Sequence, residues 1–190
     1  MNKIRINQKA TRTKVGSILR PAASGVAAAA LGTLAMDTSI YRRYQRAGGT
    51  EAFPAWESSE GLTSWENAPA PALVAKKGLE RVLGREVPPK YARFLNNATH
   101  WGMGLGTGAA YALLVSGRSP KLWYGVPFGA AVWAGGYVVL PKLGVYEQIW
   151  KYDLETLAKD LGAHLVFGTA TTAALALATS VHERTPKELA

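Results

Sequence analysis

The chain has 190 residues, enough for one domain, and it contains no cysteine, which excludes disulfides, thiol nucleophiles and cysteine-ligated metal centres. It carries 22 lysine and arginine residues against 13 aspartate and glutamate residues, a formal net charge of +9. Such a balance is common in nucleic-acid-binding proteins, but here the basic residues stand at the ends of apolar runs. This placement is typical of anchoring at lipid headgroups, so we expect no nucleic-acid partner.

Residues 1–20 are interpreted as a basic N-terminal tail. Their charged residues are all basic: Lys3, Arg5, Lys9, Arg12, Lys14 and Arg20. The first acidic residue of the chain is Asp37. A cleaved signal peptide and an organelle transit peptide share this composition, and both remain alternatives to a tail that precedes a membrane span.

Four apolar stretches have the length of about 20 residues that a helix needs to cross a bilayer. They cover residues of about 22–41, 94–116, 122–140 and 157–180. We therefore predict an all-α polytopic membrane protein, with a bundle of four transmembrane helices over residues 21–180 and a polar C-terminal tail at 181–190. Pro127 lies inside the third stretch and is expected to kink it.

The long connection 42–93 contains a predicted amphipathic helix over residues 70–84. Its apolar residues share one face: Ala72, Ala75, Leu79, Val82 and Leu83. Basic residues cover much of the remaining surface, and Gly84 ends the helix. We predict that this helix rests on the membrane surface, and the alternative is a helix that packs on its own connection.

Small residues repeat at intervals of four in the second and third stretches. They form three pairs: Gly102 with Gly106, Gly104 with Gly108, and Gly125 with Gly129. Small residues at this spacing let helix backbones approach closely in lipid, so we assign all six glycines to helix packing. Gly104, Gly106 and Ala109 also imitate a dinucleotide-binding motif, which we reject because no strand precedes them.

Four ionisable residues lie inside the predicted spans: Asp37, His100, Asp160 and His164. Because successive spans alternate in direction, all four are expected near the same membrane face and are treated as a candidate intramembrane polar cluster. Three interpretations remain open. The cluster joins helices by hydrogen bonds and binds nothing, it relays protons or lines a path for a small solute, or it binds a metal or a haem.

Two segments resemble the YagU-like family of bacterial inner-membrane proteins. The run Leu161-Gly-Ala-His164-Leu-Val-Phe-Gly is similar to the closing helix of that family, and the second stretch, with His100 and Trp101, is similar to its histidine-bearing helix. The function of the family is not known, although one member is linked with acid resistance. The resemblance implies a multi-pass protein of the bacterial inner membrane and singles out His100 and His164.

These observations together predict a non-enzymatic inner (plasma) membrane protein of uncharacterised role, in envelope integrity or acid-stress tolerance. We predict no catalytic residue and no cofactor. The expected partners are the lipid bilayer and a second copy of the chain or another membrane protein. The alternatives are a small proton- or solute-handling transporter and a metal- or haem-binding membrane protein. The basic residues before the first span predict that both termini are cytoplasmic.

Overall fold

The computed structural model describes residues 2–118 and 120–188, and side chains are described for residues 16–118 and 120–180. The described chain is helical and has no strand, which confirms the predicted all-α class. Its α-helices are α1 (Asn2–Arg46), α2 (Phe53–Glu57), α3 (Ala70–Leu83), α4 (Ala92–Leu114), α5 (Gly125–Lys142) and α6 (Leu154–Glu188). Short 3-10 helices are η1 (Pro89–Tyr91), η2 (Leu122–Tyr124) and η3 (Ile149–Lys151).

The limits of the helices confirm one prediction and correct others. The amphipathic helix is present as α3 and ends at Gly84, whose φ of 65° is a left-handed conformation that glycine adopts without strain. The basic segment is not a separate tail, because α1 is continuous from Asn2 through Pro21. Likewise, α6 continues to Glu188.

Pro127 does not lie in a helix interior, where we expected a kink. Helix α5 begins at Gly125, so Pro127 stands in the first turn of the helix. An N–H at this position has no acceptor within the helix, and its absence therefore removes no hydrogen bond. The proline inside α5 is Pro141, close to the C-terminal end.

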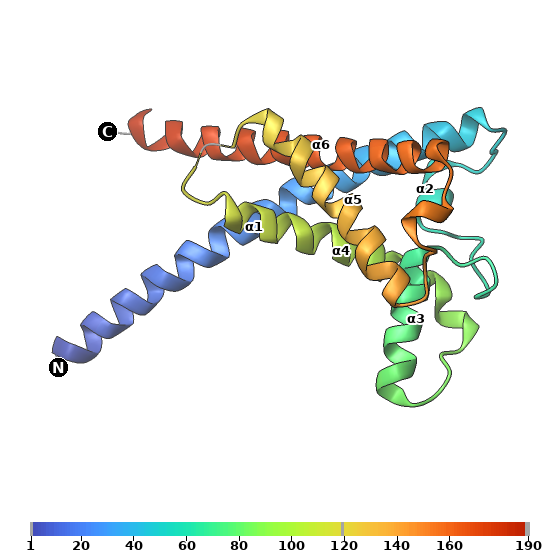
Figure 1. The fold of residues 1–190 in the computed structure, drawn as a ribbon. Coiled ribbons are helices and arrows are strands. Elements are labelled where there is room, and N and C mark those ends of the chain that lie inside the picture. The colour runs from blue at the N-terminus through green and yellow to red at the C-terminus, as the bar shows by residue number, and fades with distance from the viewer. Residues whose placement is uncertain (1, 119, 189–190) are drawn as a thin grey trace.

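The long helices are arranged so that the connection 47–52, α2 and the connection 143–153 lie at one end of the bundle, which we call the loop end (Figure 1). Both ends of the described chain lie at the opposite end (Figure 1). Helix α1 packs against α4 and α6, and α5 packs against α6. Helix α3 packs on α4 and runs crosswise to α6 in this view (Figure 1).

Glycines form the close contacts between these helices. Gly108 of α4 meets Gly25 and Ala29 of α1, and Gly125 and Gly129 of α5 meet the backbone of α6 around Gly168. In contrast, nothing in the described chain lies within 4 Å of the position that a Cβ would take at Gly102 and Gly106. Residues two apart on an α-helix differ by about 200° in direction, so only one of the two glycine pairs of α4 can face α1.

Alanine and threonine side chains make up much of the interior, and many large apolar side chains are exposed. The core contains Ala28, Ala112 and Leu175 around Tyr111, whose ring stacks on Phe128 with 4.2 Å between centroids. Exposed large apolar residues include Phe94, Leu114, Trp123, Leu154 and Leu177, each at least 62% exposed. An apolar exterior of this extent marks a surface that contacts lipid or another protein.

Two helical segments within the described residues are long and apolar enough to cross a membrane, Gly16–Arg46 and Leu154–Ser180. A core helix of a soluble protein or an N-terminal signal sequence has the same properties. By themselves the two helices are therefore weak evidence of membrane association.

Candidate functional site

The centre of the candidate site is a contact between Asp37 of α1 and His100 of α4. Nε2 of His100 lies 3.0 Å from Oδ2 of Asp37, within hydrogen-bond distance. The Asp37 side chain is 4% exposed and that of His100 is 27% exposed. A buried carboxylate is costly unless it is paired, and the imidazole supplies a partner from a second helix. The sequence placed these two residues near one membrane face, and the structure brings them into contact.

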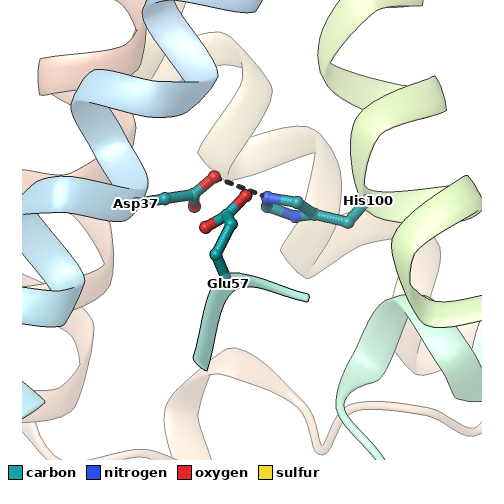
Figure 2. A group of neighbouring side chains, drawn as sticks. All are labelled: Asp37, Glu57 and His100. Atoms are coloured by element: carbon teal, nitrogen blue, oxygen red, sulfur yellow. Dashed lines mark hydrogen bonds and ion pairs between the residues drawn. The ribbon is translucent and has the colours of Figure 1, made fainter. Parts of the chain in front are cut away.

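Glu57 of α2 is the third member of the site, and the sequence analysis did not find it. One ligand atom from each of Asp37, Glu57 and His100 lies within 4.8 Å of the other two. Figure 2 shows the three side chains pointing toward one another from α1, α2 and α4. The sequence signal for this part of the site is the group of aromatic and acidic residues in the connection 42–93.

Aromatic rings hold α2 against the end of α1. The ring of Tyr41 lies 5.1 Å from that of Phe53 and 5.3 Å from that of Trp56, measured between centroids. The hydroxyl of Tyr41 donates a hydrogen bond to the main-chain oxygen of Glu51 at 2.7 Å. Aromatic pairs at these distances stabilise a contact beyond the area they bury, so the position of α2 is well defined.

Polar side chains of α4 hold the other end of α2. Arg93 Nε and Asn97 Nδ2 donate to the main-chain oxygen of Ser58, at 3.0 and 2.9 Å. Asn96 Nδ2 donates to Ser59 Oγ at 2.9 Å. Glu57 is the last residue of α2, immediately before these contacts. Its carboxylate is therefore fixed beside α4 by hydrogen bonds to its chain neighbours.

The site has more carboxylate oxygens than hydrogen-bond donors. Oε1 of Glu57 is buried and has no hydrogen-bond partner among the described residues. Burial, and then the negative charge of Asp37, raise the pKa of Glu57 above its ordinary value. Two carboxylates beside one imidazole therefore favour a bound cation or an additional proton.

The other two residues of the predicted cluster form a separate pair on α6. His164 Nδ1 lies 2.9 Å from the main-chain oxygen of Asp160 and 3.4 Å from its carboxylate. His164 and His100 are near enough for their charges to interact. The structure thus divides the four predicted residues into two neighbouring pairs, and Glu57 joins only the first.

Comparisons of the chain with protein-family models, with curated proteins and with solved structures find no match. The resemblance to the YagU-like family therefore stays a prediction that depends on two short motifs.

Proposed function

We propose that the chain is a multi-pass membrane protein that binds a divalent metal ion between Asp37, Glu57 and His100. The observation that carries this proposal is the buried Oε1 of Glu57, which has no partner in the described chain and lies beside a second carboxylate and an imidazole. A divalent cation offsets both negative charges and accepts the nitrogen lone pair of a neutral histidine. The expectation of no cofactor is revised because Glu57 supplies a third ligand.

The chemistry of these ligands favours a particular class of metal. Carboxylate oxygens together with an imidazole suit the borderline first-row divalent ions such as Mn²⁺, Fe²⁺ and Zn²⁺. Soft ions such as Cu⁺ prefer thiolates, and the chain has no cysteine. Three protein ligands leave coordination positions for water or a substrate, as in metal sites that act on a bound molecule.

The membrane part of the proposal has four spans, formed by α1, α4, α5 with η2, and α6. The apolar exterior supports it, as does the position of both chain ends opposite the loop end (Figure 1). In this arrangement the metal site lies close to one membrane face, at the level of the connection that carries Glu57. The inner-membrane location, the cytoplasmic termini and the non-enzymatic role in stress tolerance stay predictions.

Cysteine labelling tests the number of spans, since the chain has no cysteine of its own. Ser64 and Ser116 are both exposed, the first in the connection between α2 and α3 and the second in the connection after α4. Ser64→Cys and Ser116→Cys should react with a membrane-impermeant maleimide from opposite sides of sealed vesicles. The unaltered chain should not react, and labelling of both variants from one side would contradict the four-span arrangement.

Metal removal and return test the binding site. The full chain, purified in mild detergent and treated with a chelator, should take up one Mn²⁺ or Zn²⁺ ion per chain, as measured by native mass spectrometry and titration. His100→Ala should weaken binding about a hundredfold, because it removes a ligand. The matched control is His164→Ala, since that imidazole is paired within α6. Absence of binding by the native chain, or equal loss in both variants, would refute the metal site.

The proton- or solute-handling alternative uses the same residues. Two buried hydroxyls favour it, because Oγ1 of Thr33 and of Thr171 have no hydrogen-bond partner among the described residues. Thr33 lies one helical turn deeper than Asp37 on α1. A native chain that binds no metal but conducts protons in liposomes, and loses this flux in Asp37→Asn, would replace the metal proposal with this one.

A further inference from the structure

We infer that a second site, formed by α1, α5 and α6 at the loop end, binds the phosphoethanolamine group of a phospholipid. The structure has a wide, largely open cavity of about 380 Å³ there. Its polar lining includes Arg43, Lys159, Asp160, Tyr137 and Tyr146. None of the three proposed metal ligands lines the cavity, so the inference does not depend on the metal site.

One part of the lining is cationic and suits a phosphate. Arg43 Nη1 donates a hydrogen bond to the main-chain oxygen of Lys159 at 2.7 Å, and this bond fixes the guanidinium across the cavity. It uses one of the five N–H donors of arginine. The ammonium of Lys159 pairs with Glu155 at 2.5 Å on an exposed part of the same helix. A phosphate group at this position would accept charge-assisted hydrogen bonds from the guanidinium.

The other part of the lining is anionic and aromatic and suits an ammonium group. The Asp160 side chain is 30% exposed, and its carboxylate lies 3.4 Å from Nδ1 of His164. A carboxylate accepts hydrogen bonds through two oxygens, so Asp160 can accept more from a ligand. The ring of Tyr137 lies 5.3 Å from that of Tyr146 and 5.4 Å from that of Tyr152, between centroids. Burial, and then the charge of Asp160, raise the pKa of Tyr146 to about 12.

A lipid headgroup matches this arrangement of opposite charges. A phosphate and a primary ammonium stand close together in phosphoethanolamine, whereas the ammonium of choline has no N–H to donate to Asp160. Trp150, which is 75% exposed, and the tyrosines of the cavity lie at the loop end. Tryptophan and tyrosine are enriched at the level of lipid headgroups. Both the position of the cavity and the chemistry of its lining therefore favour a phospholipid headgroup.

Lipid binding by the full chain in mild detergent tests the inference. Native mass spectrometry would compare phosphatidylethanolamine, phosphatidylcholine and phosphatidylglycerol with identical short acyl chains. The first should bind about tenfold more tightly than the other two, because phosphatidylcholine has no N–H to donate to Asp160 and phosphatidylglycerol has no cationic group. Free phosphoethanolamine is the second arm. If it displaces the lipid, the headgroup alone is recognised, and if it does not, the lipid is the source.

Two substitutions assign the binding to this cavity. Arg43→Gln should lower phosphatidylethanolamine binding about tenfold, whereas Arg42→Gln, at the exposed neighbouring position outside the lining, should not. Asp160→Asn should abolish the preference over phosphatidylcholine. Equal binding of the three lipids, or no effect of Arg43→Gln, would overturn the inference. His100→Ala should retain lipid binding, so failure of the metal proposal is distinguishable.

Discussion

Gly168→Leu is expected to separate α5 from α6. It should lower the midpoint of thermal unfolding in detergent more than any of the other substitutions. A Cβ at Gly168 would lie 2.5 Å from the main-chain nitrogen of Gly129 and 2.7 Å from its Cα. These atoms belong to a helix backbone, which cannot rotate away as a side chain does. Overpacking of this kind costs on the order of 3 kcal/mol.

The control for this change is Gly162→Leu on the same helix. The position that a Cβ would take at Gly162 has no neighbouring atom within 4 Å in the described chain. Leucine favours a helix over glycine by about 1 kcal/mol, so the midpoint should stay the same or rise. Thermal unfolding of the two variants, followed by helical circular dichroism, gives the comparison. A similar loss in both would contradict the close α5–α6 contact.

The apparent metal affinity is expected to fall steeply as the pH falls through the raised pKa of Glu57. Burial, followed by the charge of Asp37, keeps the proton on this carboxyl to a higher pH than usual. The groups facing it are Asp37, His100 and the indole of Trp101. A metal ion must displace this proton, which costs about tenfold in affinity per pH unit for each proton released. Titrations between pH 5 and 8 measure the slope.

Glu57→Gln separates this effect from the other titrating groups. The variant should bind metal more weakly at neutral pH. Metal binding to the variant should release one proton fewer than binding to the native chain, so its affinity should change less with pH. In the metal-free chain, a raised carboxyl pKa stabilises the fold at low pH, and this contribution is lost as the pH rises through the folded-state pKa. The thermal midpoint of the metal-free native chain should therefore fall with rising pH more than that of the variant. Identical slopes would contradict the placement of Glu57.

The parts of the structure that depend on local pattern could be predicted. Apolar runs predict where the helices lie, and Gly84 predicts where α3 ends, because periodicity and capping depend on neighbouring residues. Counting residues along predicted spans of alternating direction placed Asp37 and His100 near the same face, and in the structure the two side chains are in contact. The number of spans stays a prediction, because two helices in the described chain have the length and hydropathy to cross a membrane.

The parts of the structure that depend on tertiary contacts could not be predicted from the sequence. Glu57 reaches the site only because α2 is held by the ring of Tyr41 and by side chains of α4, and no spacing in the sequence encodes that path. His164 was expected to share a cluster with His100, but its Nδ1 is bonded within its own helix. The choice of Gly104 and Gly108 over Gly102 and Gly106 depends on which face of α4 meets α1.

Glu57 comes from the connection 42–93 and not from one of the long helices. Binding of an ion at the site therefore depends on the position of this connection. Asp37 and His100 belong to long helices, whereas Glu57 belongs to a five-residue helix held by aromatic and amide contacts. Any opening of this segment removes one ligand, and any ion that binds all three ligands resists the opening by the same free energy. The metal-loaded chain should accordingly resist proteolytic cleavage in the connection, and cleavage there should release the ion.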